Sequence, residues 1–69
     1  MADSGSPNEA EIIAGAYAER VRDLFKIFAE SVYTGEPENT AAVRFRRGLL
    51  SARRVYAAAV EALKEADKA

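Results

Sequence analysis

The chain has 69 residues, with ten Lys or Arg and eleven Asp or Glu, a formal net charge of -1, and neither Cys nor His. That length leaves room for one domain, which buries only about 60% of the surface of its unfolded chain. The missing residue types exclude disulfides, thiolate nucleophiles, His-based acid–base catalysis and the common zinc sites. Since small folds without such staples are usually completed by association, we expect a non-enzymatic protein without cofactor or metal that binds itself or another protein.

The first six residues (MADSGS) are small and polar, which predicts a disordered leader over 1–6. They contain no basic or apolar stretch of the kind found in a secretory signal. The longest uncharged run in the second half, residues 55–60, is too short to span a bilayer. We therefore expect no membrane association, and the lack of Cys favours the reducing cytoplasm.

A long helix is predicted over about residues 7–33. Ser6 is placed as the N-cap, Pro7 as the first helical residue, and Glu9 three positions after the cap. Apolar residues then recur every three or four positions. Two further ones, Phe25 and Ile27, widen the apolar arc to about 160°, more than one neighbouring helix covers.

A breaker cluster over residues 34–39 predicts the loop after this helix. Gly35 suits the left-handed position that ends a helix, and Pro37 cannot continue one. Asn39 or Thr40 is expected to cap a second helix over about residues 40–66. A short loop between two long helices makes an antiparallel hairpin.

One face of the second helix carries apolar residues at heptad spacing, and its alternate layer is small. Ala52 belongs to that layer, and with Gly48 beside it lets the two backbones approach closely. Tyr17 and Tyr56 fall at similar heights, where their rings can stack. The predicted fold is all-α: a single domain over residues 7–69, a two-helix antiparallel hairpin that dimerises into a four-helix bundle. The predicted core and dimer positions are Ile13, Tyr17, Val21, Leu24, Phe25, Ile27, Phe28, Val32, Phe45, Leu49, Ala52, Tyr56, Val60 and Leu63.

Charge is divided unevenly along the chain. Residues 1–39 carry eight acids and three bases, and residues 40–69 carry three acids and seven bases. In an antiparallel hairpin we expect the middle and the loop end to be basic and the end with the termini to be acidic, so that copies can associate with basic parts against acidic ones.

Five arginines fall between positions 44 and 54 without an intervening acid: Arg44, Arg46, Arg47, Arg53 and Arg54. On a helix the last four form two lines with Leu50 between them and Val43 nearby. A branched apolar residue among guanidinium groups suits a protein interface better than a phosphate track. With Tyr33, which lies off the apolar stripe near the loop, they give a predicted partner-binding set of Arg46, Arg47, Leu50, Arg53, Arg54, Val43 and Tyr33.

Two other interpretations of this cluster stay open. The arginines can form a solvated face, or pair within the chain with acids such as Asp23 and Glu30. They can also bind the phosphates of a nucleic acid, although no Gly-rich phosphate loop and no third helix of a helix-turn-helix reader is present.

Helical hairpins of this length resemble dimeric RNA-binding hairpins of the Rop type and the small co-chaperones of type III secretion, in architecture alone. The sequence thus favours a protein–protein interaction module (an adaptor, chaperone or regulatory subunit) acting as a homodimer or on a partner protein. The alternative is a nucleic-acid-binding regulatory dimer.

Overall fold

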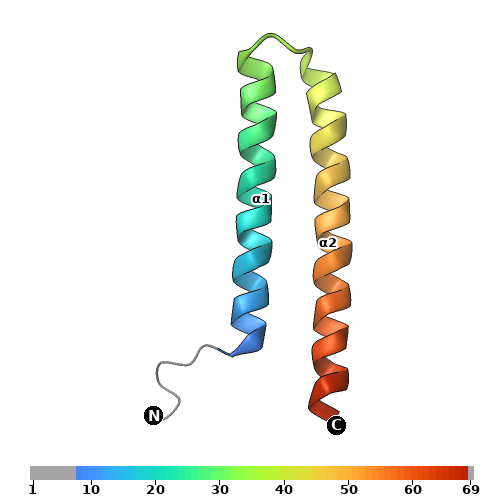
Figure 1. Cartoon of the computed structure of the whole chain (residues 1–69). Helices are drawn as coiled ribbons and strands as arrows, with labels where there is room; N and C mark the ends of the chain where they lie inside the picture. Colours follow the sequence, from blue (N-terminus) through green and yellow to red (C-terminus); the bar gives the residue numbers. More distant parts are fainter. Residues whose placement is uncertain (1–7, 69) are drawn as a thin grey trace.

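A computed structural model, described over residues 8–68, shows two long helices packed side by side in an antiparallel hairpin (Figure 1). Helix α1 spans Glu9–Tyr33 and helix α2 spans Glu38–Lys68. The start of α1 and the end of α2 lie together, opposite the loop. The described residues contain no strand, which confirms the all-α hairpin. The predicted leader lies outside the described residues.

Helix α1 begins two residues later than the sequence predicted. Its N-cap is Asn8, in an extended conformation, and the Asn8 side-chain oxygen accepts a hydrogen bond of 2.8 Å from the backbone N–H of Glu11. Asn is as good a cap as Ser, and Glu9 and Glu11 place negative charge against the positive end of the helix dipole. The expected cap, Ser6, and Pro7 lie outside the described residues.

The loop ends α1 as predicted. Gly35 has φ +102°, a conformation that costs residues with a Cβ. Its N–H donates to the carbonyl of Val32 at 3.1 Å, and the N–H of Glu36 donates to the carbonyl of Ser31 at 3.0 Å. These two bonds make a Schellman motif, which satisfies the last carbonyls of the helix and reverses the chain.

Helix α2 is longer than predicted at both ends. The carbonyl of Pro37 accepts from the N–H of Ala41 at 3.1 Å, so the helix starts at Glu38 and the expected caps, Asn39 and Thr40, lie inside its first turn. At the other end the helix continues to Lys68. Ala, Glu and Lys are strong helix formers and a final Lys favours the negative end of the dipole, which explains why the helix extends beyond the predicted end at residue 66.

Two aromatic pairs set the register between the helices. The ring centroids of Tyr17 and Tyr56 are 4.9 Å apart, and those of Phe28 and Phe45 are 5.3 Å apart, both pairs tilted by about 35°. The predicted contact between the tyrosines is therefore confirmed. Tyr17 and Phe28 are eleven residues apart in α1, and their partners Tyr56 and Phe45 are eleven residues apart in α2. The register between the helices is therefore the same at both pairs.

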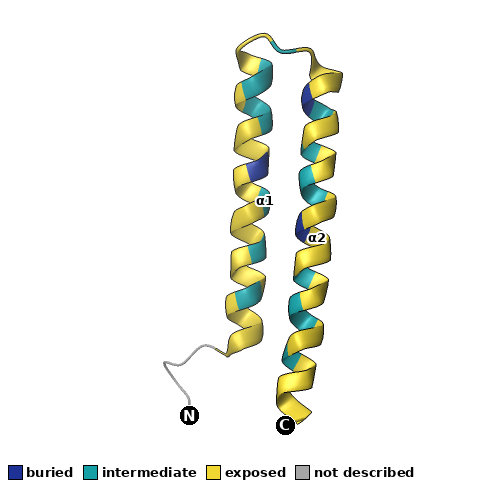
Figure 2. Ribbon diagram, turned by 45° about the vertical axis from the view of Figure 1, so that its right-hand side comes forward, coloured by how far each residue is buried: buried dark blue, intermediate teal, exposed yellow. Residues whose placement is uncertain are grey.

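Only three described residues are buried in the hairpin: Leu24, Ala41 and Ala52 (Figure 2). Leu24 and Ala52 were predicted core residues, whereas Ala41 was not. Phe25 and Ile27, also predicted for the core, are 57% and 54% exposed. The remaining predicted core positions are half-buried: Ile13, Tyr17, Val21, Phe28, Val32, Phe45, Leu49, Tyr56, Val60 and Leu63.

The exposure of Phe25 and Ile27 has a geometric cause. Each helix covers one stripe of its neighbour, and the apolar arc of α1 is wider than that stripe. Phe25 lies 100° from Leu24 around the helix in one direction, and Ile27 lies 60° from it in the other. Each therefore faces outward on a different side of the hairpin.

The helices approach closely at Gly48. A Cβ placed on Gly48 would lie 2.5 Å from Cδ2 of Leu24, well inside contact distance. This supports the prediction that the small residues of α2 let the backbones come together. Gly15, on the far side of α1, would have nothing within 4 Å of such an atom.

These two glycines give a matched test of the packing. Gly15→Ala should raise the free energy of unfolding by about 0.5–1 kcal/mol, because Ala is the better helix former. Gly48→Ala gains the same propensity but overpacks Leu24, at a cost of about 1–3 kcal/mol, so we expect a net loss of about 1 kcal/mol. Urea unfolding at one protein concentration measures both, and equal stabilisation by the two variants would contradict the close approach.

Candidate interaction surfaces

The arginine cluster lies on the first half of α2, and its five side chains are all exposed. Since residues 38–68 are continuously helical, the four arginines at positions 46, 47, 53 and 54 form the two predicted lines along the helix, with Leu50 between them. Leu50 is 51% exposed and Val43 40% exposed. The predicted set is thus brought together on α2: Val43, Arg47, Leu50 and Arg54 lie on the side that points away from α1, and Arg46 and Arg53 lie at the edge of that side.

Tyr33 does not join that surface. Although it is 84% exposed, it stands nine residues after the buried Leu24, half a turn around α1, and so points away from α2. The sequence placed Tyr33 beside the arginine end because both are near the loop. The hairpin puts them on opposite edges.

One arginine of the cluster has an acidic partner within residues 8–68. The guanidinium of Arg44 donates to the carboxylate of Glu36 in the loop. The other salt bridges of this part of the chain are local and exposed: Arg22–Glu19, Lys64–Glu61 and Lys68–Glu65. Pairing of the cluster with Asp23 or Glu30 is therefore absent from the described residues, and Arg46, Arg47, Arg53 and Arg54 are left to solvent or to a partner.

The pair formed by Arg44 and Glu36 joins the loop to α2. The hydrogen bond from Arg44 lowers the pKa of the Glu36 carboxyl from its ordinary value of 4.5, against a smaller opposing effect of desolvation. The ionised carboxylate is thus favoured in the folded hairpin. A lowered pKa stabilises the fold above the pKa of the unfolded chain, and this contribution is lost as the pH falls through the folded pKa.

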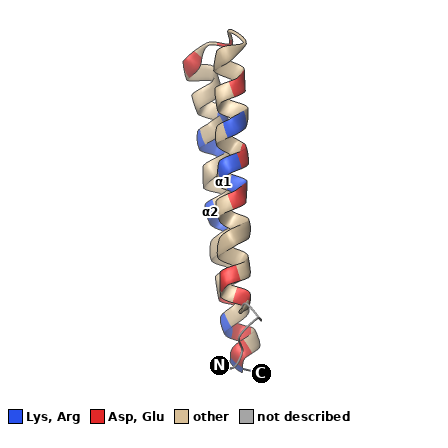
Figure 3. Ribbon diagram, turned by 90° about the vertical axis from the view of Figure 1, so that its left-hand side faces the viewer, with Lys and Arg blue, Asp and Glu red and all other residues tan. Residues whose placement is uncertain are grey.

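The structure corrects the expected distribution of charge along the hairpin (Figure 3). The middle band, residues 19–26 and 44–54, holds eight bases and two acids, a net charge of +6. The loop end, residues 27–43, holds three acids and no base, because Glu30, Glu36 and Glu38 gather there. The terminal end, residues 8–18 and 55–68, holds five acids and two bases. The hairpin is therefore basic in the middle and acidic at both ends.

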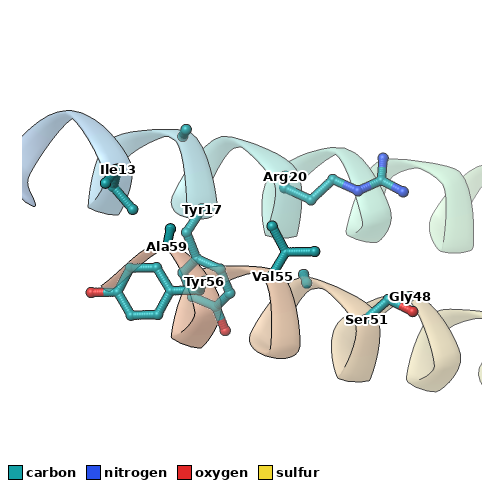
Figure 4. Close-up of a pocket in the computed structure, with 10 residues that line it drawn as sticks. Ile13, Tyr17, Arg20, Gly48, Ser51, Val55, Tyr56 and Ala59 are labelled. Carbon is teal, nitrogen blue, oxygen red and sulfur yellow. The ribbon is translucent and has the colours of Figure 1, made fainter. Parts of the chain in front are cut away.

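An apolar groove runs along one side of the hairpin, which we call the groove face (Figure 4). Its central part has a volume of about 490 Å³, with Ala16 and Arg20 on the α1 side and Gly48, Ser51 and Val55 on the α2 side. Further hollows of about 420 Å³ and 250 Å³ continue it toward the termini and the loop. Each shares residues with the central part, so the groove is continuous.

Arg20 is the one charged residue that lines the central groove. In Figure 4 its guanidinium extends along α1 toward the level of Gly48. No salt bridge to Arg20 occurs within the described residues. The sequence did not point to this groove, because Ile12, Ile27 and Val55 lie off the main stripe and Arg20 was counted only as a charge.

The opposite side of the hairpin, which we call the Phe25 face, has a different character. On α1 it carries Val21 and Phe25, and on α2 it carries Leu49 and Val60, each on the flank that does not line the groove. Its large side chains are half-buried or, at Phe25, mostly exposed. Its charged residues are confined to its edges and ends.

No group of three or more acidic side chains forms a candidate metal site among residues 8–68. Within the same residues neither helix is long and apolar enough to cross a bilayer. Comparisons with protein-family models, with curated proteins and with solved structures found no significant match to this chain. We therefore infer the function from these surfaces alone.

Replacement of Arg44 tests the contact between the loop and α2. Arg44→Gln removes the charged donor, so the pKa of Glu36 should rise toward its ordinary value of 4.5. Arg46→Gln removes a charge from the same helix without touching Glu36 and should leave that pKa unchanged. The carboxyl carbon signal of Glu36 in an NMR titration reports both, and the same pKa in all three proteins would argue against the contact.

Proposed function

We propose that this chain is a non-enzymatic protein–protein interaction module, a helical hairpin that is completed by further helices and presents the arginine cluster around Leu50 to a partner protein. One observation carries the proposal. Within the described hairpin the only large buried side chain is Leu24, while the rest of a wide apolar surface is half-buried or exposed.

A core with one large buried side chain offsets only a small part of the entropy cost of folding. Burial of one Leu side chain contributes about 1.5–3 kcal/mol, whereas ordering the backbone costs about 1–2 kcal/mol for every residue. Helices in proteins depend mainly on packing of an apolar face for their stability. A hairpin with this core therefore needs apolar surface from another helix, supplied by a second copy or by a different protein.

The arginine cluster supports a second contact, with a partner of acidic and apolar character. Arginine is enriched at the centres of protein interfaces, where its planar group binds carboxylates with two parallel hydrogen bonds. Arg46, Arg47, Arg53 and Arg54 make no salt bridge within residues 8–68, and Leu50 between them is half exposed. The absence of Cys suits a reducing compartment, so we place this role in the cytoplasm.

A second candidate function is nucleic-acid binding, as a regulatory dimer. The observation that favours it is the basic middle band, in which Arg20, Arg22 and Lys26 of α1 add to the cluster on α2. Such a band can follow a phosphate backbone, but phosphates gain nothing from contact with Leu50. We therefore rank it second.

Three variants separate the two functions. Leu50→Asp should reduce co-purification of the partner protein at least tenfold, because it places an acid in the apolar centre of the surface, and should change nucleic-acid affinity little. Arg47→Glu should weaken either kind of binding. Lys68→Glu makes the same charge change outside the middle band, at an exposed position whose only salt bridge within residues 8–68 is local, and serves as the control.

The measurements are pulldown from cells that express the tagged chain, and fluorescence anisotropy with a labelled RNA and a labelled DNA over a range of salt. Partner binding that survives Leu50→Asp, together with nucleic-acid affinity that falls steeply with salt and with Arg47→Glu, would establish the alternative function.

A further inference from the structure

The apolar surface has two sides, and they are not equally suited to a second copy of the chain. We propose that two hairpins pair through their Phe25 faces, with the two-fold axis parallel to the helices, so that α1 of each copy packs against α2 of the other and both loops lie at the same end of a four-helix bundle. This inference rests on the proposed function, since it names the helices that complete the hairpin.

Charge selects the Phe25 face over the groove face. In a two-fold dimer through the groove, both copies of Arg20, which makes no salt bridge within residues 8–68, would be enclosed in the new apolar core. Burying like charges together carries a large desolvation cost. The centre of the Phe25 face holds aromatic and aliphatic side chains only, so its burial has no such cost.

The area of this face is sufficient for a stable dimer. Helix α1 has 25 residues, about 37 Å at a rise of 1.5 Å per residue. Two helices side by side make a face roughly 20 Å wide, which gives on the order of 700 Å² for each copy. Stable interfaces bury about 600–1,000 Å² per partner, and the estimate lies within this range. A second copy therefore covers the apolar surface that the hairpin leaves open.

The edges of the Phe25 face select the direction of the axis. Its α2 edge is basic, with Arg46, Arg53 and Lys64, and its α1 edge carries Phe25 and Glu11. The aromatic register puts Phe25 level with Gly48 and Glu11 level with Ala62. An axis along the helices thus brings Arg46 and Arg53 of the second copy to either side of the Phe25 ring, a cation–π arrangement, and brings Lys64 of that copy near Glu11.

The other two-fold arrangement has its axis across the helices and is unfavourable for the same reason. It packs α2 against α2 in opposite directions. Because Arg53 is the middle residue of Glu38–Lys68, an axis through the centre of the hairpin sets Arg53 against Arg53 of the second copy. Like charges placed directly opposite each other are repulsive, so the arrangement with both loops at one end is preferred.

A matched pair of substitutions tests which face is used. Phe25 and Ile27 are 57% and 54% exposed, stand two residues apart, and lie on opposite faces of the same helix. Phe25→Ala should raise the dimer dissociation constant at least about 30-fold, because it removes the ring that packs between Arg46 and Arg53 of the second copy without adding a charge. Ile27→Ala should change it less than about threefold. Sedimentation equilibrium gives both values, and an effect confined to Ile27→Ala would overturn the proposal.

Cross-linking tests the arrangement without relying on a disruptive variant. The chain has no native Cys, so single Cys residues can be placed at exposed alanines on the two faces. Ala18 and Ala57 lie at the edges of the Phe25 face, and Ala16 and Ala58 lie at the edges of the groove face, at nearly the same levels.

In a mixture of Ala18→Cys and Ala57→Cys chains, a short bismaleimide should give a cross-linked heterodimer. The mixture of Ala16→Cys and Ala58→Cys chains should give at least about tenfold less product. The reverse result would place the dimer on the groove face. Equal, weak product from both mixtures would overturn the proposed axis, because α1 and α2 of different copies would then not be neighbours.

The outcomes also distinguish this inference from the proposed function. A chain that is folded, monomeric and stable at micromolar concentration would contradict both the dimer and the proposed function. A chain that is monomeric and poorly folded alone, but folds when its partner protein is added, overturns the dimer and leaves the interaction module intact. Circular dichroism recorded on the sedimentation samples separates these cases.

Discussion

The close packing of α1 and α2 at Gly48 is the contact on which the rest of the structure depends. With no side chain on Gly48, Leu24 can lie against the backbone of α2 and become the one large buried side chain of the described hairpin. The same contact sets the distance at which the rings of Tyr17 and Phe28 meet their partners. Close packing also limits the core to a narrow stripe, so most of the apolar arc remains for another helix.

The fold could be predicted from the sequence because its signals are local. Gly35 and Pro37 identify the loop, and apolar spacing identifies the helices around it. The start of α1 was predicted two residues early because Ser6 and Asn8 are both good caps, and local sequence does not choose between them. Asn39 and Thr40 were taken as caps for a similar reason, although the chain already becomes helical after Pro37.

The surfaces were harder to predict because they depend on which flanks of the two helices share a side. Phe25 and Ile27 were assigned to one apolar face, yet they lie on opposite sides of the hairpin. The reason is that Leu24 faces α2, and around the helix Phe25 and Ile27 lie on either side of Leu24. Tyr33 and Leu50 were assigned to one surface, yet they lie on opposite edges of the hairpin. The basic end became a basic middle band, since Glu36 and Glu38 sit at the loop itself. A helical wheel shows each helix alone and does not show how the wheels face each other.

The contrast between the two sides of the hairpin also bears on how assembly stops. If both sides were uncharged and apolar, each copy would accept a neighbour on either side, and hairpins would stack without a limit. Arg20 in the groove makes that second contact unfavourable between identical copies, because it would bring two arginines together in an apolar core. In the proposed dimer the groove stays open to solvent, together with Arg47 and Leu50. A closed pair of hairpins is then the expected end state, with the groove and the outer part of the arginine cluster, Arg47, Leu50 and Arg54, left accessible to a different protein.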